Sequence, residues 1–132
     1  MRTLAFFLLL LTGCGQVWSR AIDQATTTNN TLVAALVEIQ NAAKDQRKAK
    51  LDHVAATAPS VEAGRAEFDR IDAAYAPVWK ALEKASLAQT ALATVLEAAK
   101  VAQEPDVGEI MRLAGELQQL YAAVSRALAE VR

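Results

Sequence analysis

The stretch EPDVGEIMRLAGELQQLYAAVSRALAEV, residues 104–131, carries a complete set of signals for one amphipathic helix. Its apolar residues recur at alternating steps of three and four: Ile110, Leu113, Leu117, Leu120, Val124, Ala127 and Val131. This spacing places all of them on one face of an α-helix. Pro105 ends whatever precedes it, and Asp106 is a suitable N-cap with Glu109 three residues later. We therefore expect a helix over about residues 107–131.

A longer seam, meaning a stripe of apolar residues with the same spacing, lies upstream of Pro105 between residues 61 and 103. Its members are Phe68, Ile71, Tyr75, Val78, Leu82, Ala85, Gln89, Leu92, Leu96 and Ala99. The seam keeps its phase across Pro77, and Ala76 is a poor N-cap, so one helix kinked at Pro77 is favoured. A break into two helices at residues 75–76 is the alternative. Two seams joined by a tight turn predict an antiparallel hairpin of the 61–103 and 107–131 helices.

A third helix is expected upstream, over about residues 30–57, and Pro59 ends it. The polar run at residues 26–31 favours a helix start or a short linker, because its side chains compete for backbone hydrogen bonds. A cationic run at residues 44–50 has two interpretations: a solvated helix face, or a contact with acidic lipid headgroups or an acidic partner. The sequence thus predicts an all-α fold, a small bundle of about three long helices.

The composition agrees with this fold class. Of the 132 residues 29 are alanine, and no segment shows the sustained alternation of β-branched residues that marks strands. Alanine buries little area, so we expect a thin core and a tendency to associate. The net charge of −1 argues against a dedicated nucleic-acid binder, which would carry a basic surplus.

The chain begins MRTLAFFLLLLTGCGQVW, residues 1–18. A cation at Arg2, an apolar run over residues 4–11 and small residues after it are typical of a secretory signal peptide. Eight apolar residues cover only about 12 Å as a helix, against a bilayer core of roughly 30 Å. The run is therefore too short to cross a membrane.

The four residues that close this segment are Leu11, Thr12, Gly13 and Cys14. They resemble the Leu-x-Gly-Cys lipobox of bacterial lipoproteins. The resemblance implies that a signal peptidase recognises the first three residues and cuts before Cys14. It also implies that Cys14 carries diacylglycerol and an acylated amino group, with fatty acids such as palmitate.

The resemblance divides the chain into a signal peptide at 1–13, a lipid-anchored segment at 14–29 and a helical domain at 30–132. The mature chain would have 119 residues and, without Arg2, 13 basic and 15 acidic residues. Trp18 and Arg20 suit the headgroup region of a membrane; the alternative is that Trp18 caps the first helix or packs on the domain. We expect a location in the cell envelope. In a diderm host it would be the outer membrane facing the periplasm, because Gly15 rather than Asp follows the lipidated cysteine.

Catalytic chemistry is not indicated. His53 is the single histidine and Cys14 the single cysteine, so no metal-ligand set is expected. The serines lack a nucleophile motif, and the glycines form no phosphate-binding loop. We expect no enzyme activity and no cofactor.

Aromatic and apolar residues instead suggest a protein partner. The candidate partner-binding residues are Tyr75, Trp79, Tyr121 and Leu128. The alternative is that Tyr75 is core and Trp79 shields Pro77. The helix at 107–131 is expected to form much of the contact, because its apolar face is broader than one antiparallel partner covers.

Beyond the lipobox, the chain resembles the small helical lipoproteins of bacterial envelopes and of phage or prophage genomes. We expect a structural or interaction module whose helices self-associate or bind another envelope protein, with membrane lipid as the partner of Cys14. The first alternative is a phage- or plasmid-encoded envelope factor for lysis or superinfection exclusion. A lipid or small-ligand carrier is the remote alternative, because alanine-rich seams close cavities.

Overall fold

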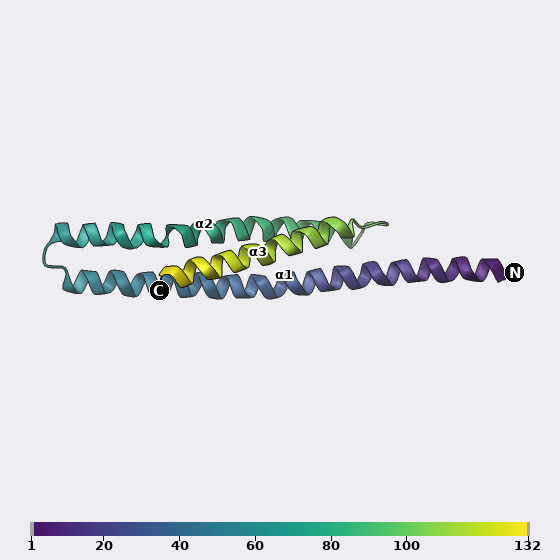
Figure 1. Ribbon diagram of the computed structural model, residues 1–132, viewed down its shortest axis with the longest axis horizontal. Coiled ribbons are helices and arrows are strands. Elements are labelled where there is room, and N and C mark those ends of the chain that lie inside the picture. The colour runs from purple at the N-terminus through teal and green to yellow at the C-terminus, as the bar shows by residue number, and fades with distance from the viewer. Residues whose placement is uncertain (1, 132) are drawn as a thin grey trace.

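The computed structural model describes the backbone of residues 2–131 and the side chains of residues 17–131. Over this range the chain forms three helices: α1 (Arg2–Thr57), α2 (Val61–Ala99) and α3 (Val107–Val131). No residue of the range lies in a strand. α2 runs back along α1, and α3 turns again and runs back along α2 (Figure 1). The expected all-α bundle and its antiparallel α2–α3 hairpin are both confirmed.

Each of the two turns carries an N-cap for the helix that follows it, and the cap at Asp106 was predicted from the sequence. Ser60 has an extended backbone, and its hydroxyl accepts a hydrogen bond of 3.1 Å from the amide of Ala63 at the start of α2. The Asp106 carboxylate accepts a 2.9 Å bond from the amide of Glu109 at the start of α3. Each cap satisfies an amide that has no partner within its own helix.

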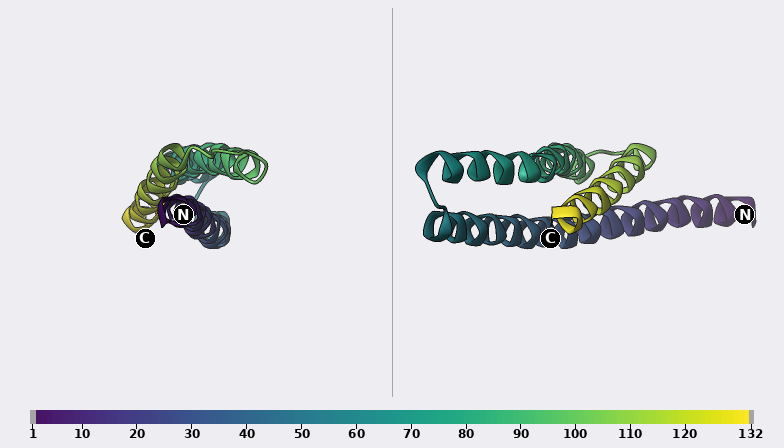
Figure 2. Two further views of the ribbon diagram at one scale, coloured as in Figure 1. Left: turned by 90° about the vertical axis from the view of Figure 1, so that its right-hand side faces the viewer. Right: turned by 60° about the vertical axis from the view of Figure 1, so that its left-hand side comes forward.

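α2 is one helix through Pro77, so the alternative of two separate helices is wrong. Pro77 is exposed, whereas Tyr75 and Val78 beside it are fully buried. The axis of α2 changes direction part-way along the helix (Figure 2, right). The proline therefore lies on the solvent side of a bent helix whose apolar seam stays in the core.

α2 ends at Ala99, four residues before the expected end at Gln103. Ala99 is the last buried residue of its seam, and Val101 is 87% exposed. The amides of Lys100 and Val101 turn to carbonyls only three residues back, at 3.3 Å each. This tightening of the final turn marks the point where packing no longer supports an α-helix.

α1 begins far earlier than the expected start at residue 30, so that boundary is wrong. Ala25 is 1% exposed and Asn29 is 8% exposed, and Ile22 packs on the same core. The hydroxyl of Thr26 donates to the carbonyl of Ile22 at 2.8 Å, which satisfies it inside the helix. Packing against the end of the α2–α3 hairpin thus overrides the weak helix preference of the polar run.

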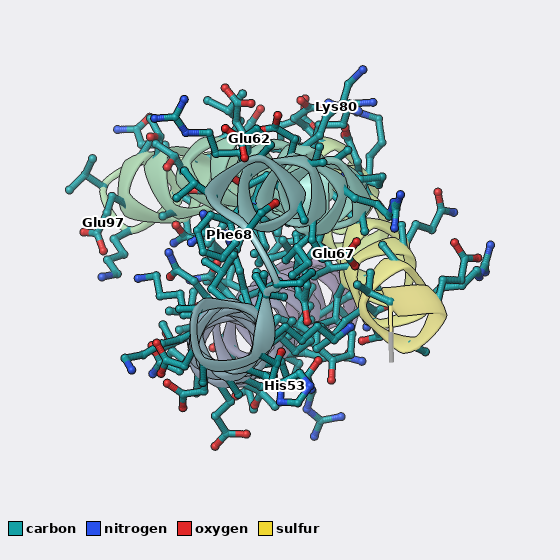
Figure 3. The ribbon with its side chains drawn as sticks, turned by 90° about the vertical axis from the view of Figure 1, so that its left-hand side faces the viewer. His53, Glu62, Glu67, Phe68, Lys80 and Glu97 are labelled. Atoms are coloured by element: carbon teal, nitrogen blue, oxygen red, sulfur yellow. The ribbon has the colours of Figure 1, made fainter. Side chains whose placement is uncertain are left out.

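The core has two parts along the bundle. One, near the α2–α3 turn, gathers buried residues of all three helices, among them Leu36, Leu92, Leu96, Ile110, Leu117 and Val124. The other, toward the α1–α2 turn, holds Ala43, Val54, Ile71, Tyr75, Val78 and Leu128. Phe68 lies between α2 and α1 in this second part (Figure 3). α1 packs on both α2 and α3, so each helix has two neighbours.

Candidate interaction surface

A junction around Lys50 joins the three helices. The ammonium of Lys50, on α1, donates a 2.7 Å hydrogen bond to the carbonyl of Val131 at the end of α3. The same ammonium lies 5.3 Å from the ring centroid of Tyr75 on α2. A cation is favoured both at a helix C-terminus and over an aromatic face. Lys50 therefore fixes where α3 ends against the α1–α2 pair.

Two further cations of this run form ion pairs at the surface. Arg47 contacts the Asp72 carboxylate of α2 through Nη2 at 2.7 Å and Nε at 2.8 Å. Lys48 pairs with Asp52 one turn along α1 at 2.5 Å, and this hydrogen bond raises the pKa of Lys48. The run is partly a solvated face, and Arg47 and Lys50 also connect helices.

A groove runs between α1 and α2 and includes Trp79. Its deeper part has a volume of about 400 Å³. The side chains that line this part come from both helices: Val33, Leu36, Val37, Gln40, Trp79, Leu82, Glu83, Ser86 and Gln89. A second hollow of about 520 Å³ shares Gln40 and Trp79 and continues toward Lys44 and Arg47. We call these together the α1–α2 groove.

The groove combines exposed apolar side chains with an aromatic ring. Val37 is 50% exposed, whereas its neighbour Leu36 is 9% exposed. Apolar side chains therefore extend from the core to the surface of the groove. The ring of Trp79 is half-buried and stacks on Tyr75, with 6.3 Å between centroids and 27° between planes. An aromatic ring held by a buried neighbour is preorganised for contact with a partner.

The structure separates the four predicted partner-binding residues. Tyr75 is fully buried and Leu128 is 4% exposed, so the prediction that they form a surface contact is wrong for both. The reason is α1, which packs on α3 beside α2 and covers the broad apolar face. Trp79 and Tyr121 are half-buried and keep an accessible edge. The burial of Tyr75 agrees with the alternative interpretation, in which it is a core residue.

The α1 side of the groove was not predicted from the sequence. Val33, Val37, Gln40 and Lys44 recur at steps of three and four, beside the buried residues Leu36 and Ala43 of α1. This second stripe is the signal that could have found the groove. The stripe is a weak signal, because only Val33 and Val37 in it are apolar.

The remaining residues considered in the sequence lie outside the α1–α2 groove. Leu11, Thr12, Gly13 and Cys14 lie in the part of α1 whose side chains are not described. His53 is exposed on α1 (Figure 3) and lies at the edge of a hollow that Glu67 and Arg70 of α2 also line. Among the described residues, no group of three or more His, Cys, Asp or Glu could hold a metal ion.

Within the part of the chain that the structure describes, none of the helices combines the length and the apolar character needed to cross a bilayer. No family model, no curated protein and no solved structure matches the chain. The site must therefore be interpreted from its own chemistry.

Proposed function

We propose that the chain is a lipid-anchored interaction module of a bacterial cell envelope, which binds a partner helix in the α1–α2 groove. The anchor would be acylated Cys14, and the motif Leu11–Cys14 supports it. The observation that carries the binding role is the half-exposed Trp79–Val37 floor of the groove, which α3 leaves open.

The chemistry of the groove describes the partner. Val37 and Leu82 offer apolar contacts, while Gln40 and Glu83 offer hydrogen bonds at the rim. An amphipathic helix with apolar residues at steps of three and four would complement both. The partner is a second copy of this chain or another envelope protein. Anchoring in one membrane would raise the effective concentration of either.

Photocrosslinking in cells tests this proposal with a matched control. A benzoylphenylalanine would replace Val37, which is 50% exposed in the groove, or Met111, which is 44% exposed on α3. We expect a discrete crosslinked product from position 37 and none from position 111. Equal labelling from both positions, or none from position 37, would refute the groove as the binding surface.

Cell fractionation tests the anchor independently. Cys14→Ser should remove the protein from the washed membrane fraction or leave it as an unprocessed precursor. A Cys14→Ser protein that is processed and stays on membranes like the parent chain would exclude lipidation as the means of attachment.

A further inference from the structure

The place of the predicted anchor relative to the bundle sets how the molecule would stand on a membrane. α1 is continuous over Arg2–Thr57, so Cys14 would be joined to the bundle by helix and not by a flexible linker. α1 extends beyond the α2–α3 turn at this end, and the α1–α2 turn lies at the opposite end (Figure 1). The anchor and the α2–α3 turn are therefore at the same end of the molecule.

The spacing along α1 gives the distances. At 1.5 Å per residue, the eight residues from Cys14 to Ile22, where core packing begins, span about 12 Å. Trp79 lies beside Gln40 and Lys44, which are 26 and 30 residues beyond Cys14, or about 40 Å along the axis. The groove would stand clear of the headgroups.

The end that carries the anchor also has exposed apolar side chains. Val17 is 64% exposed, and Val101 in the α2–α3 turn is 87% exposed, the largest value among the described exposed apolar residues. Trp18, which follows Val17 in the chain, is half-buried, and Arg20 is exposed. Such residues are favoured in the interfacial region of a bilayer.

We propose that a lipid bilayer is the partner of this end surface, formed by residues 17–20 and the turn at 100–106. The bundle stands upright on it and holds the part of the α1–α2 groove beside Trp79 about 40 Å above the anchor. The inference rests on the proposed lipidation of Cys14. The charges of this surface balance, because Arg20 and Lys100 accompany Glu104 and Asp106, so no preference for anionic lipid is expected.

The two tryptophans of the chain provide the test. The full acylated protein would be reconstituted in phosphatidylcholine vesicles with or without bromine on the acyl chains. Trp79→Phe leaves Trp18 as the emitter, and we expect brominated lipid to lower its emission about twofold or more. Trp18→Phe leaves Trp79, whose emission should not change. Quenching of Trp79, or none of Trp18, would overturn the upright orientation.

A matched pair of spin labels gives a second readout that tolerates loss of one tryptophan variant. Val101→Cys places a label at the proposed membrane end, and Val61→Cys, at a position that is 69% exposed, places one at the far end. We expect higher collision with oxygen in lipid at position 101, and higher collision with a water-soluble nickel complex at position 61. Equal accessibility would contradict the proposal. The intact mass of the same sample reports acylation separately, so failure of the anchor is distinguishable from failure of the orientation.

Discussion

Removing one oxygen atom should stabilise this protein. Tyr75 is fully buried, and its hydroxyl has no hydrogen-bond partner among the described residues. A buried hydroxyl without a partner costs about 1–3 kcal/mol. Tyr75→Phe removes that cost and keeps the ring under the Lys50 ammonium and against Trp79. We expect the free energy of unfolding to rise by about 1 kcal/mol, which corresponds to roughly 3–5 °C in melting temperature.

The assay is thermal unfolding of the full chain, followed by circular dichroism at a helical wavelength. Tyr121→Phe is the control, because Tyr121 is half-buried and its hydroxyl is not among the buried atoms that lack a hydrogen-bond partner. The control should shift the melting temperature by less than Tyr75→Phe. A clear destabilisation by Tyr75→Phe would show that the hydroxyl has a partner, such as a bound water, and would refute the reasoning.

Two further perturbations test the fold. Leu117→Asp buries an unpaired charge at a fully buried position of α3 and should cost about 4 kcal/mol or more in urea unfolding, whereas Gln118→Asp, at an exposed position, should cost little. Arg112 holds Glu109 through two hydrogen bonds of 2.7 Å, which lower the pKa of that carboxyl. Its folded pKa is thus below the unfolded value, so the stabilisation is present above the ordinary carboxyl pKa and disappears as pH falls through the lowered one. The urea midpoints of the parent chain and Arg112→Gln should therefore differ at pH 7 and converge in acid; an unchanged difference would contradict the pair.

The sequence predicted what depends on local spacing. The seams of α2 and α3, the cap at Asp106 and the continuity across Pro77 all follow from periodicity and turn chemistry. The start of α1 could not be predicted in this way, because the polar run at 26–31 is helical only through packing on the α2–α3 hairpin.

The candidate surface was predictable only in part. Trp79 was identified from its aromatic character, but Leu128 was misplaced because the sequence does not show that α1 covers two sides of the hairpin. Predicting the groove requires the register between α1 and α2. That register depends on contacts such as Arg47–Asp72 between residues far apart in sequence.

Membrane attachment through Cys14 is the claim on which the proposed function and the orientation both rest. The most direct test is the intact mass of the protein extracted from membranes of cells that express the full gene, with fragmentation to locate any modification. We predict a chain of 119 residues that begins at Cys14 and carries a diacylglycerol and an amide-linked fatty acid there. A chain that retains residues 1–13, or one that begins elsewhere with an unmodified Cys14, would contradict the account.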